Sequence, residues 1–177
     1  MASKCALLLR ENKAEDSKKC DNRATDGLSV DDNKEGRNVK VFLGGTCSGW
    51  KWRDELQPLL KCEYYNPIVK NWSEDDRLRE VHERETSDYV LYGITNGIKG
   101  VYSIAEVVDD SNKRPEKTIF LNLYKEDSRS FTKQMGHSLK AVENLLKSNG
   151  AMVFDSVSKV ASFLNLETMS RRAEDGK

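Results

Sequence analysis

The chain has 177 residues, which is enough for one ordinary domain with additional segments. Its 29 basic and 29 acidic residues give a formal net charge of +0, and this balance argues against a nucleic-acid polymer as a partner, since such surfaces need a basic excess. No apolar run approaches the ~20 residues of a membrane-spanning helix, and the first ten residues do not resemble a secretory signal. We therefore expect a soluble, cytoplasmic protein with no membrane partner.

Cysteine and histidine are the usual zinc ligands, and the chain has few of them: Cys5, Cys20, Cys47, Cys62, His82 and His137. The cysteines form no CxxC pair, and both histidines are far from them in the sequence. A zinc site is therefore not expected, and we predict neither a metal nor a cofactor. Free thiols in a reducing cytoplasm are the simpler interpretation.

Residues 1–38 have the composition of a flexible leader. They are rich in charged residues, poor in apolar ones, and balanced at eight Lys/Arg against eight Asp/Glu. Such a segment buries too little apolar surface to offset the entropy cost of its ordering. The predicted domain then covers residues 39–168, and a polar tail follows over residues 169–177.

Strands and helices alternate along the predicted domain. The run at residues 39–43 is apolar and stops at a glycine pair, which is typical of a buried strand. The helix that follows Ser73 has a good N-cap and three acidic residues in its first turn. In chain order, the predicted elements are strand 39–43, helix 50–60, strand 64–65, helix 73–86, strand 88–94, helix 101–108, strand 117–123, helix 131–147, strand 151–154 and helix 157–166.

This alternation predicts a three-layer α/β fold of the flavodoxin or Rossmann type, with a mostly parallel five-stranded sheet and helices on both faces. In such a sheet, ligands bind beyond the carboxyl ends of the strands. Asp88 begins a strand at the opposite edge, so we expect it to have a structural role such as capping the end of the preceding helix or pairing with an arginine. The loops expected at the ligand edge cover residues 44–49, 66–72, 94–100 and 123–131.

The helix over residues 101–108 carries the first candidate for chemistry. Its apolar residues have the i, i+3, i+4, i+7 spacing of a stripe that faces the core, and they are Val101, Ile104, Ala105 and Val108. Ser103 and Glu106 lie off this stripe on a common face, so we expect Glu106 to be exposed near the ligand edge. A solvated surface glutamate without a catalytic role is the alternative.

Other candidates lie in the loops at the ligand edge. Backbone N–H groups at Gly44, Gly45 and Thr46 could hold a phosphate or a ribose hydroxyl, although a tight turn also explains the glycine pair. The loop has neither the GxGxxG nor the Walker pattern, which argues against nicotinamide and ATP binding. Trp50, Trp52 and Trp72 lie where an aromatic ring could stack on a nucleobase, with core or rim packing as the alternative.

Three segments resemble the nucleoside 2-deoxyribosyltransferase-like family in the family's own order, and they are VFLGGT, NPIVKNW and SDYVLYGITNGIKGVYSIAEV. The resemblance covers about residues 39–123. It implies that Glu106 is the nucleophile and that Ser103 contacts the sugar or a phosphate. Asn66 and Gly100 lie within these segments, and we count them among the substrate-binding residues.

The family also has an aspartate in the helix before the Asp-led strand, where it serves as proton donor or base. Glu83 is our candidate for that role here, with Glu80 and His82 as alternatives. The resemblance implies an enzyme that cleaves the N-glycosidic bond of a small-molecule (deoxy)nucleoside or nucleotide and passes the sugar to a second base or to water. A non-catalytic module that binds or sequesters a nucleotide on the same fold is the alternative.

Family members often complete their pockets with residues of a neighbouring subunit, so the resemblance also implies a homo-oligomer. The helix over residues 131–147 offers an apolar face for such an interface, and this face consists of Leu139, Val142, Leu145 and Leu146.

Overall fold

The computed structural model describes residues 38–48, 51–71, 73–123 and 131–175. The predicted leader therefore lies outside the described residues, apart from Asn38. Five strands form one sheet in which every neighbouring pair is parallel, in the order β2-β1-β3-β4-β5. They are β1 (Lys40–Gly45), β2 (Glu63–Tyr65), β3 (Tyr89–Ile94), β4 (Thr118–Asn122) and β5 (Met152–Phe154).

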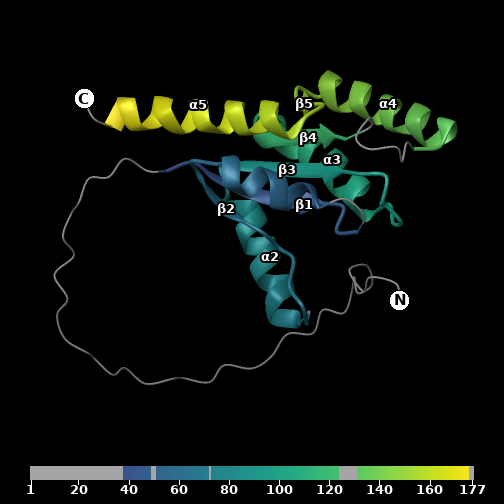
Figure 1. Ribbon diagram of the computed structural model, residues 1–177, viewed down its shortest axis with the longest axis horizontal. Helices are drawn as coiled ribbons and strands as arrows, with labels where there is room; N and C mark the ends of the chain where they lie inside the picture. Colours follow the sequence, from purple (N-terminus) through teal and green to yellow (C-terminus); the bar gives the residue numbers. More distant parts are fainter. Residues whose placement is uncertain (1–37, 49–50, 72, 124–130, 176–177) are drawn as a thin grey trace. The chain divides into compact units, whose positions relative to one another are not determined.

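Helices cover both faces of the sheet (Figure 1), so the predicted three-layer, flavodoxin-like and Rossmann-like fold is confirmed. Alternate strand residues point to opposite faces, where each set forms its own core. Helices α1 and α5 pack on one face, while α3 and α4 pack on the other. The α-helices are α1 (Trp52–Leu56), α2 (Glu74–Thr86), α3 (Tyr102–Lys113), α4 (Lys133–Ser148) and α5 (Val157–Asp175), and the short 3-10 helices are η1 (Gln57–Leu59) and η2 (Pro115–Lys117).

Helix α2 projects from the sheet (Figure 1), and none of its residues is fully buried. It begins as the sequence predicts, because the Ser73 hydroxyl accepts a hydrogen bond from the Asp76 N–H while the Asp76 carboxylate accepts one from the Ser73 N–H. Its contacts with the rest of the domain are mainly polar and lie along its second half. These contacts determine where its acidic side chains point.

Helix α3 uses only part of the apolar stripe that its spacing predicts, since Ile104 and Val108 pack against the core. Val101 is 82% exposed because it precedes the helix as its N-cap, so its side chain does not belong to a helical stripe. The buried residues of α3 are Val107, Asp110 and Ser111. The predicted stripe was thus right for Ile104 and Val108 and wrong for Val101 and Ala105, and the most buried residues were not predicted because apolar periodicity does not register a buried aspartate that is held by hydrogen bonds.

Helix α5 continues to Asp175, well beyond its predicted end near residue 166. Two arginines explain the extension, since Arg171 Nη1 lies 2.7 Å from Asp88 Oδ1 and Arg172 Nη2 lies 2.7 Å from Asn38 Oδ1. Asp88 Oδ2 also accepts a hydrogen bond from the Lys40 N–H at 2.9 Å. The predicted structural role of Asp88 is therefore confirmed.

The apolar face of α4 belongs to the domain's own core. Leu139 and Leu146 are 2% and 0% exposed against the sheet, and Val142 packs beside them. Leu145 is the one member of the predicted face that is exposed. Assigning this face to an interface between subunits was therefore wrong, because the helix uses the same periodicity to cover its own sheet.

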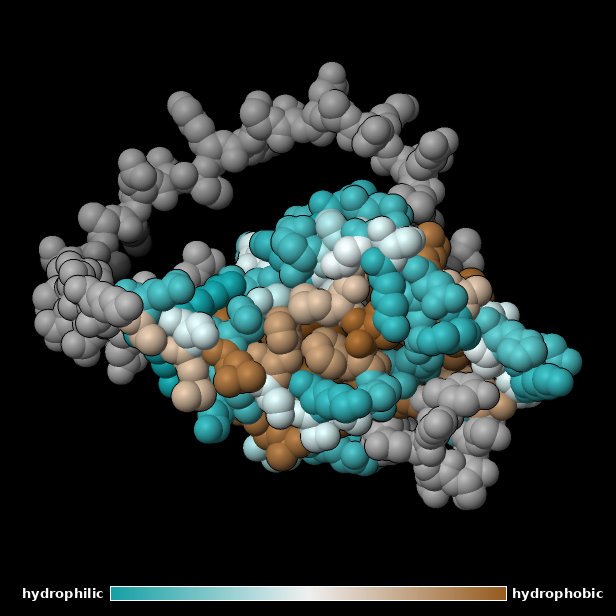
Figure 2. All heavy atoms as spheres, turned by 90° about the horizontal axis from the view of Figure 1, so that it is seen from above, coloured by the Kyte–Doolittle hydropathy of each residue, from teal (hydrophilic) through white to brown (hydrophobic). Residues whose placement is uncertain are grey.

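Apolar side chains gather in the middle of the surface that Figure 2 shows, with polar side chains around them. On this side of the sheet lies the edge strand β5, whose three residues are all half-buried.

Cys47 is an exposed free thiol and Cys62 a buried one. Within the described ranges no His, Cys, Asp and Glu cluster could hold a metal ion, and no described helix is long and apolar enough to cross a membrane.

Candidate active site

The glycines after β1 allow the chain to approach β3 closely. Gly45 has a φ of 98°, and a Cβ atom there would lie 2.3 Å from the carbonyl oxygen of Gly93. The Thr46 N–H donates to the same carbonyl at 2.8 Å. A Cβ atom on Gly44 would lie 3.0 Å from ring atoms of Phe42 and Tyr92. Backbone conformation and the close approach to β3 therefore account for Gly45, and packing against two aromatic rings accounts for Gly44, while contact of either with a ligand stays a prediction.

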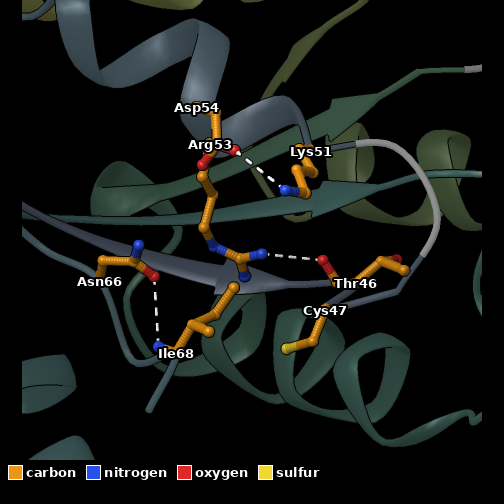
Figure 3. A pocket seen from close by; sticks show the side chains of 7 residues that line it. All are labelled: Thr46, Cys47, Lys51, Arg53, Asp54, Asn66 and Ile68. Atoms are coloured by element: carbon orange, nitrogen blue, oxygen red, sulfur yellow. Dashed lines mark hydrogen bonds and ion pairs between the residues drawn. The ribbon is translucent and has the colours of Figure 1, made fainter. Parts of the chain in front are cut away.

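A cavity of about 280 Å³ opens beside this turn, at the carboxyl ends of β1 and β2. Two of the predicted binding residues, Thr46 and Asn66, line it together with Cys47, Lys51, Arg53, Asp54 and Ile68 (Figure 3). Trp50 and Trp72 lie outside the described residues. Trp52 is fully buried and packs over Gly93, so it serves the core.

Arg53 forms one wall of this cavity and is 3% exposed. Its Nε, Nη1 and Nη2 donate to the backbone carbonyls of Leu43, Thr46 and Gly45 at 2.9, 2.8 and 3.3 Å. Burial lowers the pKa of Arg53 to about 10, against the opposing effects of Cys47 and nearby acids. The guanidinium is thus a fixed cation at the carboxyl end of β1.

Glu106 is largely buried, with 15% of its side chain exposed, which contradicts the exposed position predicted for it. Its Oε1 accepts a hydrogen bond from Arg84 Nη1 at 3.1 Å. An ion pair of this kind lowers the pKa of a carboxyl, but burial acts more strongly here, and the charges of Glu80 and Asp110 add to it. The pKa of Glu106 is therefore raised to about 7.

A buried network holds Arg84 in place beneath Glu106. Asp110 is 0% exposed and accepts hydrogen bonds from Arg84 Nε at 2.9 Å, from the Tyr92 hydroxyl at 2.5 Å, and from Arg114 Nη2 at 2.6 Å. Burial would raise the pKa of Asp110, but these hydrogen bonds keep it below its usual value. Asp110 therefore stays ionised and positions the guanidinium that contacts Glu106.

Glu80 lies one helical turn before Arg84 on α2, so the two side chains share a face of that helix. Burial raises the pKa of Glu80, although the charges of Arg84 and Arg53 act in the opposite direction. The charge of Glu80 in turn raises the pKa of Glu106. Two carboxyl groups with raised pKa values therefore come from α2 and α3, and one of them, Glu80, also interacts electrostatically with the arginine of the cavity wall.

The other predicted residues have different surroundings. Glu83, our candidate for the acid/base, forms an ion pair with Lys40 at the amino end of β1, and the structure does not bring it to Glu106. Ser103 is half-buried in the first turn of α3. Gly100 is exposed, and a Cβ atom there would meet no atom within 4 Å.

No protein-family model, curated protein or solved structure matches this chain. The roles of the site residues therefore rest on their geometry, burial and charge. Of the three acid/base alternatives named from the sequence, Glu80 is the one whose charge raises the pKa of Glu106.

Arg53, Arg84 and Asp110 were missed by reasoning from the sequence. A weak signal exists for two of them, because Glu80–Arg84 and Glu106–Asp110 are both i, i+4 pairs that place polar side chains on one helix face. No local signal identifies Arg53 as a buried residue, since its partners are backbone carbonyls of β1 and the following turn.

Proposed function

We propose that the protein cleaves the N-glycosidic bond of a (deoxy)nucleoside or nucleotide, with Glu106 as the nucleophile and Glu80 as the acid/base. The observation that carries this proposal is the carboxyl pair itself: burial raises the pKa of both Glu106 and Glu80, the charge of Glu80 raises that of Glu106 further, and Glu80 interacts electrostatically with Arg53, which lines a cavity at the carboxyl edge of the sheet. Enzymes that cleave glycosidic bonds usually use a pair of carboxyl groups with different proton affinities as their catalytic groups.

In the first step, a carboxylate oxygen of Glu106 attacks the anomeric carbon of the sugar. The C–O bond to Glu106 forms while the C–N bond breaks, and its electron pair goes to the departing nucleobase, which takes a proton from the Glu80 carboxyl. In the second step, water or another nucleobase attacks the same carbon and restores the Glu106 carboxylate, while Glu80 accepts the released proton. Water makes the enzyme a hydrolase, and a second base makes it a transferase.

Arg84 supports this chemistry through its contact with one carboxylate oxygen of Glu106. Its Nη1 binds Oε1, so Oε2 is the oxygen that attacks. The same positive charge favours the ionised form of Glu106, which is the nucleophilic form. Because Asp110 anchors Arg84 from the core, the carboxylate is held in one orientation before substrate arrives.

The same ion pair is also the feature that favours the alternative, a non-catalytic nucleotide-binding module. A carboxylate that is bound by an arginine can serve only to join α3 to α2, and the cavity can hold a nucleotide without any chemistry. The two functions differ in one observable, which is the release of free base.

The first prediction tests the enzyme directly. Incubation with a panel of deoxynucleosides and deoxynucleotides should release free base, detected by chromatography, and Glu106→Ala should reduce this release at least about 1,000-fold because it removes the nucleophile. Glu106→Gln should be nearly as inactive, since it keeps the size but loses the charge. Glu80→Gln should slow release by about 100-fold or more.

Glu85→Gln is the matched control, because this exposed glutamate lies on the same helix as Glu80 and should leave base release unchanged. If the wild-type protein binds a nucleotide but releases no base, and Glu106→Ala binds it equally well, the binding module replaces the enzyme as the function.

A further inference from the structure

The cavity beside the carboxyl pair has a positively charged lining. Two of its lining side chains are cations, Lys51 and Arg53, whereas Asp54 is the one carboxylate among its described lining residues. Lys51 Nζ and Asp54 Oδ2 are 3.9 Å apart and both side chains are well exposed, so this contact is weak and leaves the ammonium group able to turn toward a ligand.

Arg53 is the buried part of this lining. A guanidinium has five N–H donors, and three backbone carbonyls each accept one hydrogen bond from it. Within the part of the chain that the structure describes, no carboxylate forms an ion pair with Arg53. The acids Glu80 and Asp54 act on Arg53 only through their charge, so the guanidinium is a buried cation without a directly bound carboxylate, and an anion in the cavity would stabilise it.

Further donors surround the guanidinium, which lies in the middle of the labelled side chains in Figure 3. The Thr46 oxygen accepts a hydrogen bond from the Thr95 N–H at 3.3 Å, so its own hydrogen can be donated to a ligand. The Asn66 oxygen accepts one from the Ile68 N–H at 3.2 Å, which leaves its NH₂ group as a donor. A fixed guanidinium with an ammonium, a hydroxyl and an amide is a donor set suited to a phosphoryl group.

We propose that this cavity is a subsite for the phosphoryl group of a mononucleotide, so that the substrate of the carboxyl pair is a nucleotide rather than a nucleoside. The claim that the nucleotide is a substrate rests on the proposed function, whereas the subsite itself rests on the side chains that line the cavity. A volume of about 280 Å³ is near the lower end of the range for ligand sites, roughly 300 Å³, which fits a mononucleotide better than a dinucleotide.

The subsite and the carboxyl pair are neighbours. Arg53 and Glu80 are close enough for the charge of each to act on the other, and Glu80 acts in the same way on Glu106. Because Arg53 lines the cavity and acts on Glu80, we expect the sugar of a mononucleotide whose phosphoryl group binds at Arg53 to extend toward the two carboxyl groups. The phosphoryl group would supply binding energy that positions the anomeric carbon for attack.

Cys47 provides a direct report on this subsite, because its exposed thiol lines the cavity. We would measure the rate of Cys47 alkylation by iodoacetamide in the full chain, following the peptide that contains Cys47 by mass spectrometry. A deoxynucleoside 5′-monophosphate should slow alkylation at least about 5-fold at saturation. The matching deoxynucleoside and inorganic phosphate, each at the same concentration, should slow it less than about 2-fold.

Lys51→Ala should raise the nucleotide concentration needed for half-protection about 10-fold, which corresponds to about 1.4 kcal/mol. Arg53→Lys should raise it further, because a lysine keeps the charge but loses the planar donor set. Lys61→Ala is the matched control, since Lys61 is exposed and does not line the cavity. Its half-protection concentration should equal that of the wild-type protein.

Equal protection by the nucleoside and the nucleotide would overturn the proposal, as would unchanged protection in Lys51→Ala. Protection by inorganic phosphate equal to that by the nucleotide would show a site for free phosphate and overturn the assignment to substrate. Base release, measured on the same samples, separates the two proposals. Phosphate-dependent protection without base release supports the subsite and rejects the enzyme, whereas base release from nucleosides without such protection supports the enzyme and rejects the subsite.

Discussion

Glu106 combines two properties that normally oppose each other, because it is bound by an arginine and yet has a raised pKa. Burial and the neighbouring acids outweigh Arg84, and the carboxyl titrates near neutral pH. In the unfolded chain the same group titrates near 4.5. Folding therefore strengthens the binding of this proton, and the stability that the proton contributes, which is fully present below pH 4.5, is lost as the pH rises through about 7.

The raised pKa of Glu106 therefore predicts a pH dependence of the protein's stability. Between pH 5 and pH 8, the wild-type protein should lose about 1–3 kcal/mol of stability relative to Glu106→Gln, which cannot titrate at this position. Urea unfolding of both proteins at the two pH values measures the difference. Glu85→Gln should follow the wild-type protein at both pH values. A difference that stays constant with pH would mean that Glu106 has an ordinary pKa.

The pair of helices α2 and α3 is joined by charge rather than by apolar packing. Asp110 on α3 is the centre of this joint, and its partners are Arg84, Tyr92 and Arg114. No residue of α2 is fully buried, so the ion pairs along its second half determine how its acidic residues meet α3.

The substitution Asp110→Asn tests whether Asp110 holds α2 and α3 together. It removes the charge shared by two arginines in a buried setting, and we expect a loss of about 3–5 kcal/mol in the free energy of unfolding, measured with urea. Asp109→Asn is the matched control, because its side chain is 50% exposed and bonds mainly to Lys113. That change should cost less than about 1 kcal/mol. Similar losses in the two variants would contradict the central role of Asp110.

The elements of this fold were largely predictable from the sequence, whereas the surroundings of the site were not. The strands are short apolar runs, and Ser73 marks the start of α2, so both are visible in a local window of sequence. The buried face of α3 depends on Asp110, whose partners Tyr92 and Arg84 are 18 and 26 positions away in the chain. No local pattern identifies partners at such separations.

At the scale of the whole molecule, the last turns of α5 contact the amino edge of the sheet through polar side chains. Arg171 binds Asp88 at the start of β3, and Arg172 binds Asn38 just before β1. The sequence has few apolar residues in this region, which is why it suggested a polar tail. The contacts instead make the end of α5 part of the domain.

Two truncations should therefore have different effects. Removal of residues 169–177 should lower the free energy of unfolding by about 1–2 kcal/mol, because Asp88 loses a charged partner. Removal of residues 1–37 should change it by less than about 0.5 kcal/mol, since that segment has few apolar side chains to bury. Urea unfolding compares both with the full chain, and an equal loss in the two would show that the leader also stabilises the domain.

The hydrogen bonds between Arg172 and Asn38 also place the two ends of the domain side by side, at the edge of the sheet opposite the cavity. A short linker could join residue 175 back to residue 38 while the chain is opened elsewhere, for instance at the exposed turn before β5 that contains Gly150. The permuted chain would begin with β5 and α5 and end with α4. Every residue of the cavity and of the carboxyl pair would remain within one uninterrupted segment, so the site could be studied in a chain with a different order of synthesis.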